Sequence, residues 1–212
     1  MVNPTIADSG GGQAKRWVVG ITGASGAIYG TTLCRHLLTA GFHLHLVVSD
    51  AGWRVIKEEL GWNVTNRLDC LNTAFDSAIS EGRMTYHPLN DIGATIASGS
   101  FRCEGMAIVP CSMGSLSAVA NGASTNLLTR AADVMLKEGR PLLIVPRETP
   151  LHAIHLENML KLARLGAKII PAMPAFYNGP RTLEDIVGFI VGKTMDAMGI
   201  DHNIYRRWGQ PE

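Results

Sequence analysis

The sequence predicts an α/β fold: a single-domain, Rossmann- or flavodoxin-like, three-layer structure with a mainly parallel sheet. Short apolar runs alternate with longer segments of helical periodicity along most of the chain. Glycine and small hydroxyl residues follow the apolar runs, as expected of turns between strands and helices. The 212 residues, 46% of them hydrophobic, can bury one sizeable core. Residues 16–212 are therefore predicted to form one domain, and the polar, glycine-rich residues 1–15 a disordered leader.

Each element is predicted from its pattern. Residues 17–22 form an apolar run typical of a buried strand, and residues 27–40 follow with helical periodicity. The same alternation then predicts strands at 42–49, 106–110, 141–146 and 168–171. It predicts helices at 51–60, 149–166 and 182–198, and a mostly helical region at 115–138. Residues 61–105 have weak periodicity, so no element is assigned there. Such alternation implies right-handed crossovers and helices on both faces of the sheet.

The composition excludes several classes of protein. Lys and Arg total 19 against 18 acidic residues, so no basic field favours nucleic acid or a membrane surface. No apolar stretch approaches the roughly 18 residues of a membrane span. The four cysteines form no CxxC pair, which predicts reduced thiols and a cytoplasmic protein.

Four predicted strands end in turns that should meet at one edge of the sheet. These turns read TGASG (22–26), SDAG (49–52), PCSMGS (110–115) and PRETP (146–150). Two of them, TGASG and CSMGS, place Gly and Ser at a helix N-terminus, where free N–H groups and the helix dipole favour an anion. Each could hold a phosphate, although Ser and Gly also serve simply as helix caps.

A nicotinamide-dependent short-chain reductase is one alternative. The glycines of TGASGAIYG fall close to the turn of those enzymes, and Asp50 lies about where a ribose-binding acid would follow the second strand. Those enzymes, however, share a catalytic Tyr followed by Lys four residues later. None of the four tyrosines in this sequence has that partner, so the alternative lacks its acid.

Three runs carry a resemblance to a known family. They are ITGASGAIYG (21–30), VPCSMGSLSAVANGASTNLLTRAADVMLKEGRPLLIVPRETPLHAIHLENMLKLARLGAKIIPAMPAFY (109–177) and IYRRWG (204–209). Together they resemble the UbiX/Pad family of flavin prenyltransferases, over residues 17–209. The resemblance implies transfer of the dimethylallyl group of dimethylallyl phosphate to N5 and C6 of reduced FMN, without a metal. It also implies a homododecamer with sites at subunit contacts and a UbiD-type decarboxylase that receives the prenylated FMN.

The resemblance also implies an FMN site built from small residues and one cation. Small residues let the backbone approach a planar ring closely. The implied FMN-binding residues are Gly23, Ala24, Ser25, Ser49, Ser112, Met113, Gly114, Ser115 and Arg130.

A prenyl phosphate bound without Mg²⁺ needs cations and hydrogen-bond donors in place of the metal. By resemblance, the residues that bind the donor are Lys137, Arg147, Tyr177, Lys193 and Trp208. Family members often carry Arg where Lys193 aligns, so a bidentate fork becomes a point charge here. Phe176, Tyr177 and Trp208 are the aromatic residues expected near the allylic cation.

Three residues are catalytic candidates by resemblance: Glu148, Glu59 and Ser25. Glu148, directly after Arg147, is the candidate for proton transfer. Glu59 is a second acid in a stretch, KEELGW, that departs from the family, so Glu58 could take its place. His152 and His155 lie three apart but lack a third ligand nearby, so no metal site is predicted.

Two further alternatives belong to other classes: a flavin-dependent decarboxylase of peptidyl cysteine, which shares the fold family, and a non-catalytic flavin carrier. The donor residues implied in PRETP, together with Lys137, argue against both.

Overall fold

The described strands join one sheet in the order β3-β2-β1-β4-β5-β6. The computed structural model describes residues 15–207 and 209, so the predicted leader lies outside the described residues except for Lys15. Every pair of neighbouring strands runs parallel. The strands are β1 (Arg16–Ile21), β2 (His43–Val48), β3 (Met84–His87), β4 (Gly105–Cys111), β5 (Leu142–Pro146) and β6 (Lys168–Ile169).

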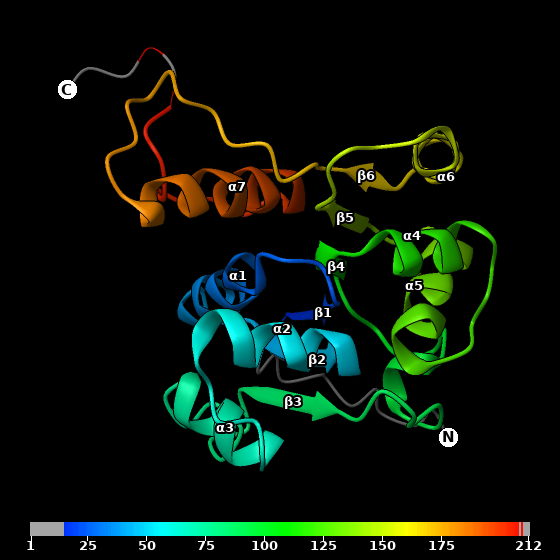
Figure 1. Ribbon diagram of the computed structural model, residues 1–212. Coiled ribbons are helices and arrows are strands. Elements are labelled where there is room, and N and C mark those ends of the chain that lie inside the picture. Colours follow the sequence, from blue (N-terminus) through cyan, green and yellow to red (C-terminus); the bar gives the residue numbers. More distant parts are fainter. Residues whose placement is uncertain (1–14, 208, 210–212) are drawn as a thin grey trace, which may run out of the picture.

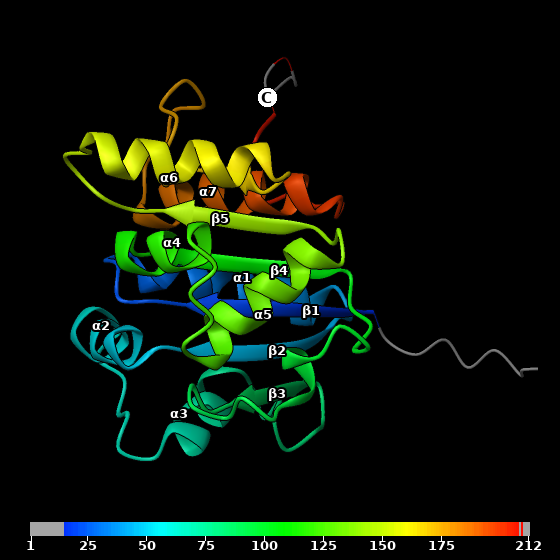
Figure 2. The same cartoon turned by 90° about the vertical axis from the view of Figure 1, so that its right-hand side faces the viewer.

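Helices cover both faces of this sheet, as Figure 1 shows. One face packs against α1 (Ala27–Thr39), α2 (Asp50–Leu60), α3 (Arg67–Ala74) and α7 (Leu183–Met198). The other packs against α4 (Met113–Ala120), α5 (Leu127–Lys137) and α6 (Ala153–Arg164), which lie in front of the strands in Figure 2. The predicted three-layer α/β architecture with a mainly parallel sheet is confirmed.

The apolar runs of the sequence follow from this double coverage. Successive residues of a strand point to opposite faces, so Val19 packs with the α1 layer and Val18 with the α4 layer. Both residues are fully buried, as are their neighbours in β4, Met106 and Ala107. A parallel sheet buried on both faces therefore reads as a continuous hydrophobic run.

One predicted helical region is divided in two, and one predicted helix begins later than expected. The mostly helical region expected at 115–138 is two helices, α4 and α5, because Asn126 starts a new one with a capping box to Thr129. The helix expected at 149–166 begins only at Ala153, because Pro150 disfavours helical backbone at Thr149 and the N-cap His152 has extended backbone. The unassigned residues 61–105 contain α3, β3 and the 3-10 helix η1 (Thr95–Ala97).

The strand order locates the binding crevice. On one side of β1 lie β2 and then β3, and on the other side lie β4, β5 and β6. The chain therefore adds strands first on one side of β1 and then on the other. In open parallel sheets, ligands bind beyond the carboxyl ends of the strands at the point where the order reverses. That point lies between β1 and β4, so the turns after Ile21 and Cys111 form its walls.

Among residues 15–207 and 209, none of the helices has both the length and the apolar character needed to cross a membrane.

Candidate flavin and prenyl phosphate site

Thr22 ties the two turns of the crevice together. Its side-chain hydroxyl donates to the carbonyl of Pro110 (2.9 Å) and accepts from the backbone N–H of Ser112 (2.7 Å). The residue is 1% exposed, so water does not compete for these bonds. The ends of β1 and β4 are thereby fixed beside each other, across 90 residues of sequence.

The N-terminus of α4 is arranged to receive an anion. Ser112 caps it, since its hydroxyl accepts from the N–H of Ser115 at 3.3 Å and donates to the Ser115 hydroxyl at 3.1 Å. Within the described chain, the N–H groups of Met113 and Gly114 have no hydrogen-bond acceptor. A Cβ built on Gly114 meets nothing within 4 Å, so a ligand can approach this backbone closely. These are the properties of a phosphate site.

The N-terminus of α1 is filled by the chain's own carboxylate. Glu59 on α2 accepts from the N–H of Gly26 at 2.9 Å and from that of Ala27 at 3.0 Å. Gly26 itself has no side chain to cap the helix, and its φ of 103° lies in the left-handed region. The sequence suggested that TGASG could hold a phosphate at the α1 N-terminus. The structure corrects this, because the Glu59 carboxylate already accepts from the N–H groups at that N-terminus. Of the two candidate acids in KEELGW, Glu59 is the one that reaches this turn.

Gly23 serves packing in the same turn. A Cβ placed there would lie 2.4 Å from the Cβ of Ala51, in the first turn of α2. Ser49 caps this helix by accepting from the N–H of Gly52 at 3.0 Å. The predicted residues Gly23, Ala24 and Ser49 therefore all lie at the carboxyl ends of β1 and β2.

Arg147 joins the crevice from the end of β5. Its Nε donates to the carbonyl of Ser25 at 3.2 Å, a contact that spans 122 residues of sequence. Tyr29, on the first turn of α1, lies within the fields of both Arg147 and Glu59. Its pKa is raised by burial, and of these two charges Arg147 lowers it and Glu59 raises it. Ser25, Glu59, Arg147 and Tyr29 thus share one charged region.

Glu148 lies beside this region, at the rim of a small cavity. Its Oε1 accepts from the N–H of Thr149 at 3.0 Å, and the side chain is exposed. The cavity, about 70 Å³, lies between residues 146–149 and residues 171–173.

Arg130, on the first turn of α5, is 44% exposed and pairs with Asp133 at 3.5 Å.

Lys137 lies at the opposite edge of the sheet. It is the last residue of α5, four residues before Pro141, whose carbonyl accepts from Met106 near the start of β4. Its Nζ pairs with Glu138 at 3.0 Å. Arg147 follows the other end of β5, and a strand of this length spans about 16 Å. Within one chain, Lys137 and Arg147 therefore do not meet.

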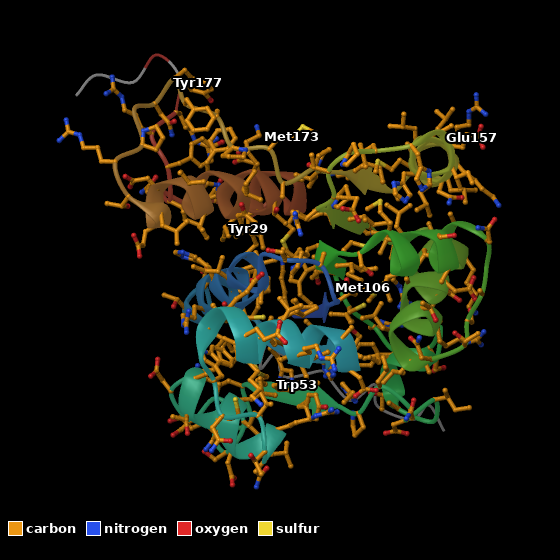
Figure 3. All side chains as sticks on the ribbon, in the orientation of Figure 1. Tyr29, Trp53, Met106, Glu157, Met173 and Tyr177 are labelled. Atoms are coloured by element: carbon orange, nitrogen blue, oxygen red, sulfur yellow. The ribbon has the colours of Figure 1, made fainter. Side chains whose placement is uncertain are left out.

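Tyr177 and Lys193 lie in a third place, around α7. The segment that joins β6 to α7 passes over α7 on the side opposite α1 (Figure 1). It carries Tyr177 and Met173, both labelled in Figure 3. Lys193, in the second half of α7, is 49% exposed and lies 3.9 Å from Asp196. Trp208 lies outside the described residues.

The described residues contain no group of three or more His, Cys, Asp or Glu side chains that could hold a metal ion. His152 and His155, which invite a metal interpretation in the sequence, stack on each other with ring centroids 3.5 Å apart.

Sequence reasoning missed three contributors to these regions. Thr22 and Tyr29 both lie within the run ITGASGAIYG. Their partners are remote in sequence: Pro110 for Thr22, and Arg147 and Glu59 for Tyr29. The third is Asp196, whose partners follow it within 11 residues in the tail. A carboxylate in the last turn of a helix, where the dipole disfavours it, was the available signal.

The fold and the free α4 N-terminus define a doubly wound α/β protein that binds a phosphate-bearing ligand at its switch point. A family model described as Flavoprotein matches residues 7–195. A flavin prenyltransferase UbiX of Alkalihalophilus pseudofirmus is 53% identical over 196 residues, covering 92% of this chain and 97% of that protein. The chain therefore belongs to the flavoprotein family, within its group of UbiX-type flavin prenyltransferases.

Solved structures agree with this assignment. The crystal structure of AnUbiX (PadA1) in complex with FMN and dimethylallyl pyrophosphate has a TM-score of 0.85 and 40% identity, covering 94% of this chain and all (100%) of that one. A dodecameric FMN-dependent UbiX-like decarboxylase from Escherichia coli O157:H7 has a TM-score of 0.82 and 42% identity, with coverage of 92% and 100%. The peptidyl-cysteine decarboxylase EpiD, at 14% identity and a TM-score of 0.57, shares the fold alone.

Proposed function

We propose that this protein is a flavin prenyltransferase, which joins the dimethylallyl group of dimethylallyl phosphate to N5 and C6 of reduced FMN. The observation that carries the proposal is the convergence of Arg147, Ser25 and Glu59 beside the open N-terminus of α4. One cation and one free helix N-terminus at the same crevice suit two ligands that each carry a phosphate. The 53% identity to a flavin prenyltransferase UbiX supports the reaction.

FMN fits the turns between β1 and β4. We assign its phosphate to the free N–H groups of Met113 and Gly114 and to the hydroxyls of Ser112 and Ser115. Gly23, Ala24, Ser25 and Ser49 would lie against the rest of the molecule, and Arg130 would add a cation. The reduced flavin supplies two nucleophilic positions, N5 and C6, and the chain supplies orientation and charge.

Arg147 is the residue at the crevice that we assign to the phosphate of the prenyl donor. Breaking the bond between the allylic carbon and the phosphate oxygen leaves the electron pair on the phosphate, and the guanidinium stabilises that charge. Tyr177 and Trp208 are assigned to the prenyl chain, whose developing positive charge aromatic faces stabilise.

Lys137 reaches this donor only if another copy of the chain supplies it, since it lies at the opposite edge of the sheet from Arg147 in one chain. We therefore infer a homododecamer with its sites at subunit contacts, as the E. coli relative is dodecameric. Helix α6 and its C-cap residue support such contacts with large apolar side chains that are more than half exposed: Ile154, Leu156 and Leu160 in the helix and Leu165 directly after it.

Glu148 is assigned to proton transfer, with Ser25 and Glu59 as further catalytic residues. Bond formation would displace one proton from N5 and one from C6, while the bond to C6 would use the prenyl double bond and add one proton to the prenyl chain. The exposed Glu148 carboxylate at the end of β5 can carry such a proton at Oε2, because Oε1 already accepts from Thr149. The free thiols of all four cysteines suit a cytoplasmic location. A UbiD-type decarboxylase is the proposed consumer of the prenylated FMN, and residues 16–212 the proposed catalytic domain.

The test is to incubate the protein with reduced FMN and dimethylallyl phosphate and to measure the mass of the flavin. A gain of one prenyl unit, undiminished by EDTA, is expected. An unchanged flavin, or activity that EDTA abolishes and Mg²⁺ restores, would refute the metal-free reaction.

Arg147→Ala sharpens the assignment of the donor phosphate. It should lower kcat/KM for dimethylallyl phosphate about ten- to a hundredfold, the effect of losing one charge-assisted contact, and leave FMN affinity intact. Weakened FMN binding with an unchanged KM for the donor would show that Arg147 binds FMN and not the donor, and would refute this assignment.

Glu148→Gln tests the proton transfer. FMN and the donor should still bind, and the rate of prenyl transfer should fall on the order of 100-fold, because the amide cannot exchange a proton in the same way. Turnover at the wild-type rate would remove Glu148 from the catalytic residues.

A further inference from the structure

Asp196 gathers the side chains of the C-terminal tail onto α7. Its carboxylate accepts from the hydroxyl of Tyr205 at 2.5 Å, from the guanidinium of Arg207 at 2.7 Å and from His202 Nε2 at 3.2 Å. We call these four residues the tail clasp. The Asp196 side chain is 23% exposed and that of His202 only 3%, so the clasp is partly shielded from water.

Two glycines shape α7 to receive the tail. A Cβ on Gly192 would lie 2.3 Å from the ring of Tyr205, and one on Gly188 would lie 3.2 Å from Ile204. These glycines are four residues apart and hence on one face of the helix. Ile204 and Tyr205 pack against the hydrophobic core through this groove. The absence of side chains at Gly188 and Gly192 therefore allows Ile204 and Tyr205 to pack directly against α7.

The tail clasp lies beside Lys193 and is linked to Tyr177 through the ring of Phe189. Lys193 Nζ lies 3.9 Å from the Asp196 carboxylate, one turn away on α7. The ring of Tyr205 packs on Phe189 (5.2 Å between centroids), and Phe189 meets the ring of Tyr177 edge-on at 6.1 Å. A tail held at Asp196 thus supports Tyr177 from beneath, through Phe189.

The charges keep Asp196 ionised. Burial raises its pKa, but hydrogen bonds from Arg207 and Tyr205 and the charges of Arg207 and His202 outweigh that effect and lower it. Burial, together with the hydrogen bond to Asp196, raises the pKa of Tyr205 to about 12. The carboxylate therefore remains a hydrogen-bond acceptor and the phenol a donor at neutral pH.

We propose that Asp196 is a positioning residue for the prenyl donor, because it fastens the tail to α7 and so holds Tyr177 and Lys193 in place. The inference rests on the proposed function, which assigns those two residues to the donor. Lys is a point charge on a flexible stem, whereas Arg presents a rigid fork. A carboxylate three residues further along α7 restricts that stem, which suits a chain that carries Lys at position 193.

The test compares Asp196→Asn with the wild type in the protein loaded with oxidised FMN, so that no prenyl transfer occurs. Equilibrium dialysis measures the Kd of dimethylallyl phosphate, and hydrogen exchange followed by mass spectrometry measures the protection of residues 199–207. We expect about tenfold weaker donor binding, faster exchange in that segment and unchanged FMN affinity. Removing a negative charge near a phosphate would by itself strengthen donor binding, so the two explanations predict opposite signs.

Three further variants complete the experiment. Asp196→Glu should restore part of the donor affinity, and Tyr205→Phe, which loses only the hydroxyl, should have a smaller effect in the same direction. Glu184→Gln is the matched control, because Glu184 is an exposed acid in the first turn of α7, about three helical turns from Asp196. It should change neither measurement.

Unchanged or tighter donor binding in Asp196→Asn would overturn the proposal, and so would weaker binding without faster exchange in residues 199–207. A wild-type protein that binds dimethylallyl phosphate but leaves reduced FMN unprenylated would refute the proposed function, while the Asp196 comparison would still stand. A wild-type protein that does not bind the donor would refute both.

Discussion

The turn after β1 and the turn after β4 look alike in sequence and differ in what they can bind. Both lead from a buried strand through Gly and Ser into a helix. The α1 N-terminus accepts the carboxylate of Glu59, whereas the α4 N-terminus keeps the N–H groups of Met113 and Gly114 free of protein acceptors in the described chain. A helix N-terminus is thus an anion site only where the fold has not already supplied the anion.

The glycines of the two turns differ in the same way. Gly23 is required because Ala51 leaves no space for a Cβ, while the space beside Gly114 is open. One glycine serves packing within the chain and the other serves the approach of a ligand. This contrast is directly testable.

Gly114→Val should have the largest effect, and it should fall on FMN binding. A branched side chain at the second residue of α4 blocks the free N–H groups, and losing two charge-assisted hydrogen bonds weakens FMN binding on the order of 100-fold or more. Folding should be unaffected, because a Cβ at this position meets no protein atom within 4 Å. Titration of FMN fluorescence measures the affinity. Ser117→Val, one turn further along α4, is the matched control, and equal FMN affinity in both variants would contradict the placement of the phosphate.

Gly23→Ala should instead act on stability. Its Cβ would lie 2.4 Å from that of Ala51, an overlap that costs about 1–3 kcal/mol and lowers Tm by roughly 2–4 °C for each kcal/mol. Thermal unfolding measures the loss. Adding Ala51→Gly should recover part of it, and strictly additive effects of the two changes would show that the contact is not the cause.

Glu59→Gln should have the smallest effect, a loss of about 1 kcal/mol, because the amide keeps one acceptor oxygen for the α1 N-terminus. Thermal unfolding and the rate of prenyl transfer, measured together, separate its two roles. A lower Tm with an unchanged rate identifies a helix cap, whereas a slower rate at an unchanged Tm identifies a catalytic acid. Glu58→Gln, at the neighbouring exposed position, should change neither.

The local pattern of the sequence determined the sheet, its crossovers and the edge at which the site lies. Strands such as β1 and β4 are buried on both faces, so their apolar runs are unmistakable. The short strand β3 lies at the edge of the sheet and is only half buried along its middle, and α3 buries one residue, Leu71, so neither produced a clear period. The quoted runs likewise sufficed to indicate the family, because its motifs are local in sequence.

Only the tertiary structure decided which residues of those motifs act together. That Glu59 rather than Glu58 reaches the α1 N-terminus depends on how α2 docks beside α1. That Lys137 lies at the edge of the sheet opposite Arg147 depends on the path of α5. The contacts that define the site span 33, 90 and 122 residues of sequence. Local periodicity reports which face of an element is buried, but not which distant element covers it, and charge and hydrogen bonding at the site depend on that partner.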